Sequence, residues 1–103
     1  MGGRHIMKKA LLIATYREVI DKEKLNEYAK VAGPAMISAG GRILARGLPS
    51  EVFEDGLNER TVVIEFPSVE AAKSAYNSEE YQEAVKILDG GAIRDMRVIE
   101  AAD

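Results

Sequence analysis

The sequence predicts an α+β domain of the ferredoxin-like type, in which a four-stranded antiparallel sheet carries helices on one face only. Three observations lead to this prediction. Apolar and turn-forming residues follow the order strand, helix, strand, strand, two helices, strand, which is the split βαβ order. The length of 103 residues suits a single domain. An uninterrupted apolar segment near the N-terminus is typical of a strand that is buried on both faces.

The first six residues, MGGRHI, have the character of a remnant of expression cloning, so we expect one domain spanning residues 7–103. His5, the only histidine in the chain, falls in this remnant, and the sequence contains no cysteine. The domain should therefore lack a histidine base, a haem or zinc ligand and a thiol nucleophile. We predict neither a metal site nor a cofactor.

The segment 9–16, KALLIATY, is expected to form the first strand. Asp21 is a favourable N-cap for the helix that follows, in which apolar residues repeat at helical spacing. Pro34 interrupts this helix and predicts either a kink or a fresh helix start. Gly40 and Gly41 should end the helix, because glycine adopts the left-handed conformation of a C-terminal cap at little cost.

The segment 41–47 is expected to form a second, more polar strand, and residues 50–55 could extend it beyond Pro49. The dipeptide Asp55-Gly56 predicts the turn of a hairpin. The third strand should follow at residues 60–66, with the sequence RTVVIEF.

The second half of the chain predicts two helices and a final strand. Ser68 and Ser78 are each followed two residues later by a glutamate, a pattern that favours helix N-caps. In the second of these helices, Tyr81 begins an apolar repeat at helical spacing, and two glycines after Asp89 should end it. The alternating segment 93–101 is expected to be the last strand.

The third strand predicts what lies on each face of the sheet. Because successive side chains alternate, Val62, Ile64 and Phe66 should face the helices, while Thr61, Val63 and Glu65 face away. The first strand is apolar on both faces, so the open face would expose large apolar side chains. We therefore expect a homodimer in which two sheets pack against each other.

Two longer segments resemble a known family. They are AGPAMISAGGRILARG, residues 32–47, and VVIEFPSVEAAKSAYNSEEYQEA, residues 62–84. Together they resemble the DUF1330 family of small bacterial proteins, within the dimeric α+β barrel superfamily, and the resemblance covers nearly the whole chain from Met7. It implies the ferredoxin-like fold and a dimer whose two sheets form a barrel. It implies no reaction, since the family is itself uncharacterised.

The candidate residues for chemistry are Glu65, Arg46 and Tyr16. Glu65 should lie on the open face inside the dimer, where a desolvated carboxylate needs a cation beside it, and Arg42 and Arg46 are the obvious partners. A structural ion pair is one interpretation of Glu65, and a base or substrate anchor is the other. Arg46 could hold a carboxylate or enolate, and Tyr16 could donate to the same ligand.

Charge and hydropathy exclude two classes of partner. The 14 basic and 17 acidic residues give a net charge of -3, and no basic cluster could neutralise a run of phosphates, so we expect no nucleic acid partner. No segment reaches the roughly 18 consecutive apolar residues of a membrane span, so we expect a cytoplasmic protein with no membrane partner.

Three functional hypotheses remain open. The preferred one is a homodimer that binds a small organic molecule in a barrel or cleft. The second is a cofactor-free enzyme of the monooxygenase, isomerase or dehydratase type, acting on a small organic acid, phenol or lactone. It rests on analogy of fold, with Glu65 as acid or base, Arg46 as anion holder and Tyr16 assisting. The third is a purely structural dimer.

Overall fold

The structure, a computed structural model, describes residues 8–102 of the chain. The elements are β1 (Ala10–Val19), α1 (Lys22–Ser38), β2 (Arg42–Gly47), β3 (Thr61–Phe66), α2 (Val69–Tyr76), α3 (Glu79–Leu88) and β4 (Ala92–Glu100). This order confirms the ferredoxin-like α+β prediction. The expected cloning remnant at residues 1–6, with His5, lies outside the described residues, so that boundary stays a prediction.

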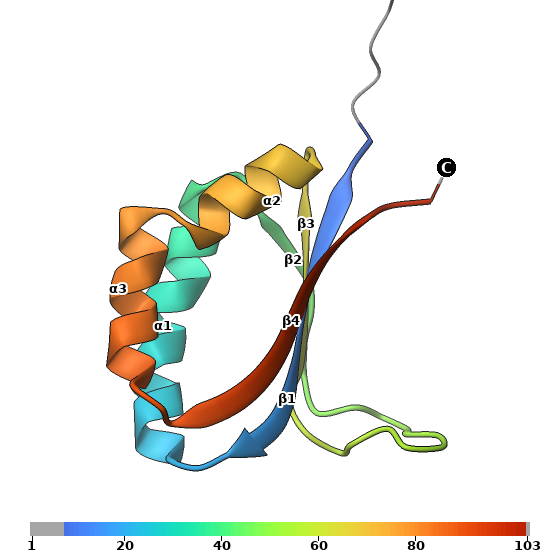
Figure 1. Cartoon of the computed structure of the whole chain (residues 1–103), viewed down its shortest axis with the longest axis vertical. Helices are drawn as coiled ribbons and strands as arrows, with labels where there is room; N and C mark the ends of the chain where they lie inside the picture. The colour runs from blue at the N-terminus through green and yellow to red at the C-terminus, as the bar shows by residue number, and fades with distance from the viewer. Residues whose placement is uncertain (1–7, 103) are drawn as a thin grey trace, which may run out of the picture.

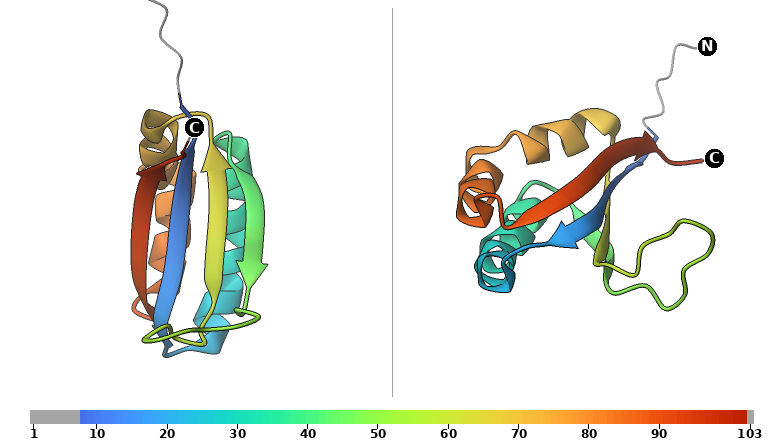
Figure 2. Two further views of the ribbon diagram at one scale, coloured as in Figure 1. Left: turned by 90° about the vertical axis from the view of Figure 1, so that its right-hand side faces the viewer. Right: turned by 60° about the horizontal axis from the view of Figure 1, so that its bottom comes forward.

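The four strands form one antiparallel sheet in the order β2-β3-β1-β4. β1 is central and pairs with β3 on one side and β4 on the other, as its apolar sequence predicts. All three helices cover the same face of the sheet, and no helix or strand of residues 8–102 covers the other (Figure 1). The left view of Figure 2 looks onto this open face, with the helices behind it.

The predicted helix caps are confirmed. Asp21 Oδ1 accepts hydrogen bonds from the backbone N–H groups of Glu23 and Lys24, at 3.0 and 3.1 Å. Ser68 and Ser78 cap α2 and α3 in the same way, each accepting a backbone N–H three residues further on. These side chains satisfy amides that would otherwise lack partners in the first helical turn.

Helix α1 runs without a break through Pro34 and ends at the predicted glycines. Gly40 adopts a positive φ of 98°, and the Gly41 N–H donates to Met36 O at 2.9 Å. A Cβ at Gly41 would lie only 2.9 Å from side-chain atoms of Ile64 and Phe66. Glycine is therefore required at position 41, where the chain that leaves α1 passes close to side chains of β3.

Two predictions about strands are wrong in detail. β1 continues to Val19 rather than ending at residue 16, because a bulge after Tyr16 keeps it paired with β4. Residues 50–55 do not extend β2. They belong to a loop, residues 48–60, that leaves the sheet at Gly47 and projects on the open side of the sheet (Figures 1 and 2). Its turn places the positive φ, 52°, at Glu54 rather than Gly56.

The core lies between the sheet and the helices. Ile64 and Phe66 of β3 are buried there and Val62 packs against the same cluster, which confirms the predicted face of that strand. Alanines on the inner sides of α1, α2 and α3 let the helices approach the sheet closely. Phe66 of β3 and Tyr81 of α3 are the largest side chains that are almost fully enclosed among the described residues, each with 1% exposure.

Candidate functional site

A hollow lies between α1, α3 and the helix-covered face of the sheet. The space open to the centre of a water molecule is about 50 Å³, and the whole atom-free volume, including the solvent-open mouth, is about 510 Å³. Most of its lining is apolar, and no carboxylate belongs to it. The lining consists of Leu12, Ala14, Tyr16, Tyr28, Ala29, Ala32, Gly33, Met36, Ile43, Arg46, Arg60, Val62, Ile64, Tyr81 and Met96.

A polar cluster of two tyrosines and one arginine borders the hollow. The hydroxyls of Tyr28 on α1 and Tyr81 on α3 are 2.5 Å apart. Arg94 Nη1, on β4, donates to the Tyr28 hydroxyl oxygen at 2.7 Å and to that of Tyr81 at 3.2 Å. The Arg94 guanidinium also lies 4.9 Å from the Tyr28 ring centre and 5.7 Å from that of Tyr16. Oxygens and aromatic faces thus surround this cation without a carboxylate.

The protonation of this cluster follows from its burial. Burial and the nearby Tyr81 raise the pKa of Tyr28 well above its ordinary value, so Tyr28 is a neutral phenol. Burial lowers the pKa of Arg94, but the tyrosine oxygens outweigh that effect and keep the guanidinium charged. With Arg94 donating to both oxygens, one hydroxyl proton bridges the tyrosines. The second hydroxyl proton has no acceptor among residues 8–102.

Arg46 reaches the hollow because β2 contains a bulge. Ile43 pairs with Ile64, but Ala45 pairs with Val63, so Leu44 is an extra residue in the ladder. The extra residue reverses the alternation, and Arg46 is placed opposite Val62 on the helix-covered face. Its guanidinium lies over α1, where Nη1 would be 3.7 Å from a Cβ added to Gly33.

Arg60 lines the hollow from the end of the loop that precedes β3. Its backbone carbonyl accepts the Tyr16 N–H at 3.0 Å, which fixes this part of the chain beside β1. Its Nε is buried and has no hydrogen-bond partner in the described part of the chain. A buried guanidinium N–H without an acceptor is rare and needs an explanation.

Glu65 lies on the opposite face of the sheet. It pairs with Lys9 Nζ and Arg42 Nε, each at 3.6 Å, so the expected cation partner is Arg42 and not Arg46. The structure thus brings Tyr16 and Arg46 together at the hollow and separates both from Glu65. The bulge at Leu44 is the physical reason, because regular alternation would have kept Arg42 and Arg46 on one face.

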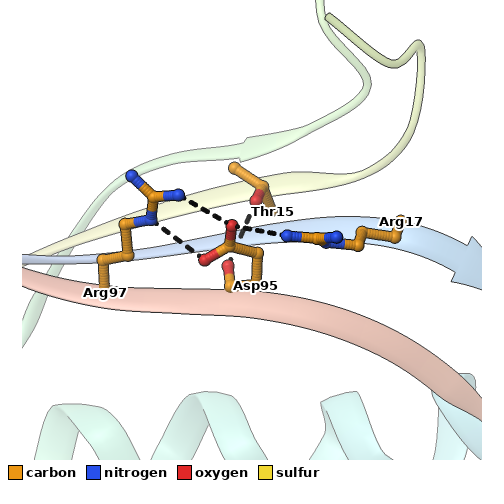
Figure 3. Close-up of polar contacts among 4 residues, drawn as sticks. All are labelled: Thr15, Arg17, Asp95 and Arg97. Carbon is orange, nitrogen blue, oxygen red and sulfur yellow. Dashed lines mark hydrogen bonds and ion pairs between the residues drawn. The ribbon is translucent and has the colours of Figure 1, made fainter.

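A second charged group occupies the open face, centred on Asp95 of β4 (Figure 3). Its carboxylate accepts two hydrogen bonds from Arg97, both at 3.0 Å, and one from Arg17 at 3.1 Å, while Thr15 Oγ1 donates to the Asp95 carbonyl. Hydrogen bonds from Arg97 and then Arg17 lower the pKa of Asp95 below its ordinary value. This carboxylate is already bound by two cations, as expected of a structural ion pair.

Sequence reasoning did not select Arg60, Arg94 or the pairing of Tyr28 with Tyr81. For the two arginines a signal was present. Arg60 shares the alternation of Val62 and Ile64, and Arg94 shares that of Met96 and Val98, so period two places each on an apolar face. The contact between the tyrosines depends on how α1 packs on α3, which local patterns do not encode.

The described residues contain neither a cluster of metal ligands nor a helix that could span a membrane. Within residues 8–102, no three histidine, cysteine or acidic side chains gather where they could hold a metal ion. In that same stretch, no helix has the length and apolar character needed to cross a membrane.

Solved structures with the same fold have low sequence identity to this chain. The RPA0582 protein of unknown function from Rhodopseudomonas palustris has a TM-score of 0.70 and 19% identity, over 93% of this chain and 84% of that one. A dimeric ferredoxin-like protein of unknown function from Thermobifida fusca has a TM-score of 0.67 and 14% identity, over 92% of each chain. SnoaB, a cofactor-independent oxygenase from Streptomyces nogalater, has a TM-score of 0.64 and 10% identity, over 93% of this chain and 95% of that one.

These likenesses show that the fold is shared, and they carry no information about activity. No curated protein sequence is significantly similar to the chain. A family model described as a domain of unknown function, DUF1330, matches residues 9–102. This match confirms the resemblance predicted from the segments 32–47 and 62–84. The chain therefore belongs to the DUF1330 family.

Proposed function

We propose that this chain is a homodimer that binds a small, mainly apolar organic molecule in the hollow between its helices and its sheet. The observation that carries this proposal is the hollow itself, which combines an apolar wall with a few polar groups from different elements. Small-molecule sites commonly have this composition, because apolar contacts supply affinity and a few polar groups fix orientation.

The polar groups lie where they could orient a ligand. Tyr28 and Tyr81 offer one free hydroxyl proton between them, while Arg46 and Arg60 offer guanidinium N–H groups. Tyr16 adds an aromatic face. The enclosed space of about 50 Å³ holds a few water molecules, so a larger ligand must also occupy the open mouth.

The open face supports the homodimer. Leu11, Ile13 and Val63 lie side by side at its centre, only partly buried, and Ile99 beside them is 55% exposed. A contiguous apolar surface of this kind is typical of an interface. Two solved structures with this fold, from Thermobifida fusca and Bacteroides fragilis, are described as dimeric.

The loop 48–60 supports the same arrangement. It projects beyond the sheet on the open side, where a facing subunit would lie (Figure 1). It carries four large apolar side chains that are exposed to solvent in the described chain, with Phe53 76% exposed. We propose that this loop contacts the second subunit. The four are Leu48, Val52, Phe53 and Leu57.

The enzyme alternative has less support. It would need Glu65, Arg46 and Tyr16 to act on one substrate, but Glu65 lies on the other face of the sheet and is already paired with Lys9 and Arg42. The oxygenase among the structural relatives supports a shared fold, which is not evidence for a shared reaction.

Native mass spectrometry of the protein as purified from cells tests both parts of the proposal. We expect the mass of a dimer and a reproducible small-molecule adduct that is lost on gentle activation. A monomer at micromolar concentration would contradict the homodimer. A bare dimer that also takes up none of the small organic compounds described below would favour the purely structural alternative.

A further inference from the structure

The arginines of this chain fall into two groups. Residues 8–102 contain six, and the side chains of four have hydrogen-bond or ion-pair partners. Those four are Arg17, Arg42, Arg94 and Arg97. The other two, Arg46 and Arg60, have no side-chain partner within this stretch, and both line the hollow. The unpaired positive charge of the sheet is thus concentrated at one site.

Residues 8–102 offer no anion to these two arginines. No aspartate or glutamate lines the hollow, and the carboxylate of Glu65 is on the far side of the sheet with two cations of its own. The Nε of Arg60 is shielded from solvent and lacks an acceptor within residues 8–102. A shielded N–H of a guanidinium attracts an anionic oxygen strongly, because few water molecules compete for it. Arg46, whose side chain is exposed, lines the same hollow and adds a second positive charge.

We infer that the hollow selects an organic anion, a small carboxylate whose charged end lies at Arg46 and Arg60 and whose apolar body fills the space against β1 and α1. This inference rests on the function proposed above and adds the chemical class of the ligand. A guanidinium is planar and its paired donors match the two oxygens of a carboxylate. Much of the remaining lining is apolar, with Leu12, Ala14 and Ala32 among it, and suits a hydrocarbon or aromatic body.

The structure also accounts for how Arg46 reaches this site. The bulge at Leu44 turns Arg46 from the open face toward the helices. There its guanidinium lies next to Gly33 of α1, where a Cβ would meet Nη1 at an ordinary contact distance of 3.7 Å. The bulge in β2 therefore sets the direction of this side chain, and α1 packs beside it.

Matched pairs of a carboxylate and its neutral amide test the inference directly. The probes are acetate and acetamide, isobutyrate and isobutyramide, and benzoate and benzamide. Each is titrated into the full-length protein while the methyl NMR signals of Met36 and Met96 are followed, because both side chains line the hollow. We expect each acid to bind at least about tenfold more tightly than its amide, the gain of charge-assisted hydrogen bonds.

Variants assign that preference to the two arginines. The double substitution Arg46→Gln with Arg60→Gln should remove the acid preference and leave amide affinity unchanged. Arg42→Gln, on the same strand but on the open face, is the matched control and should keep the preference. Arg46→Gln alone should reduce it, and the comparison of acids with amides in the unmodified protein does not depend on any variant folding.

The outcomes separate this inference from the proposed function. Acids and amides that shift the methionine signals at equal concentrations would overturn the anion inference and leave small-molecule binding intact. If none of the six compounds shifts these signals at millimolar concentration, both fail. An acid preference that survives in the double variant would also overturn the assignment to Arg46 and Arg60.

Discussion

On the open face of the sheet the carboxylates Glu65 and Asp95 are each bound by two cations, whereas on the helix-covered face Arg46 and Arg60 have no anion among the described residues. Both faces belong to the same four strands, and neighbouring residues alternate between them. The difference shows which charges the fold itself satisfies. Charges that are paired within the chain hold the strands in place, and those left unpaired beside a hollow are available to a ligand.

The two faces also differ in how apolar groups are covered. The helix-covered face buries its side chains against α1, α2 and α3, while the open face leaves Leu11, Ile13 and Val63 only partly buried. Truncations on the first face should therefore destabilise each subunit. Charges introduced on the second should separate subunits that remain folded.

The largest effect is expected for Tyr81→Ala. Its ring is almost fully enclosed and packs edge-on against Tyr28, so truncation should lower the free energy of unfolding by about 3–5 kcal/mol. Urea denaturation followed by circular dichroism measures this loss. Ile37→Ala, on the exposed side of α1, is the control and should change stability by less than about 0.5 kcal/mol. Equal losses would contradict the placement of the core.

On the open face, Val63→Asp should act on assembly. In a facing-sheet dimer this position lies between apolar strands, and an unpaired buried carboxylate costs about 3 kcal/mol or more, which weakens association at least about a hundredfold. Sedimentation velocity across a range of concentrations should show monomers that retain the native circular dichroism spectrum. Ile37→Asp controls for added charge and should remain dimeric. A dimeric Val63 variant would argue against the facing sheets.

Arginines on the two faces should differ in their contribution to stability. Arg94 donates to two shielded tyrosine hydroxyls, so Arg94→Met should cost about 1.5–3 kcal/mol. Arg97→Met removes an exposed partner of Asp95, which keeps Arg17, and should therefore cost much less stability than Arg94→Met. Urea midpoints of the two variants give the comparison. A larger loss of stability for the Arg97 variant would mean that the fold depends more on Arg97 than on Arg94, which would contradict this comparison.

Much of this fold could be predicted from local patterns. Helix starts at Asp21, Ser68 and Ser78 depend on a side chain and amides a few residues away, so the sequence contains the whole interaction. The inward face of β3 follows from simple alternation. The position of Arg46 could not be predicted, because the bulge at Leu44 depends on how β2 pairs with β3. The hydroxyl contact of Tyr28 with Tyr81 depends on helix packing in the same way.

The ion pairs of Asp95 on the open face predict that the stability of the fold depends on pH. Arg97 and Arg17 hold the pKa of Asp95 below its ordinary value of 3.8, so the folded state favours the carboxylate. The resulting stability is fully present above that ordinary value and is lost as the pH falls through the lowered pKa of the folded state. Asp95→Asn should therefore lower the urea midpoint at pH 7 and show a shallower further loss in acid. Parallel pH profiles for both proteins would contradict this.

The smallest effect is expected for Glu65→Gln, and it tests the comparison at the residue for which sequence reasoning proposed chemistry. Its partners Lys9 and Arg42 are exposed and 3.6 Å away, so the substitution should change stability by about 0–1 kcal/mol. Because Glu65 is on the far side of the sheet from Arg46, benzoate affinity should stay within a factor of two of the wild-type value. This factor corresponds to a change of about 0.4 kcal/mol in the free energy of binding. Titration of benzoate into the Glu65→Gln and Arg46→Gln variants in parallel provides the measurement. A loss in the Glu65 variant equal to that in the Arg46 variant would mean that the two faces share one site, and only a contribution from the second subunit could then bring the carboxylate to the ligand.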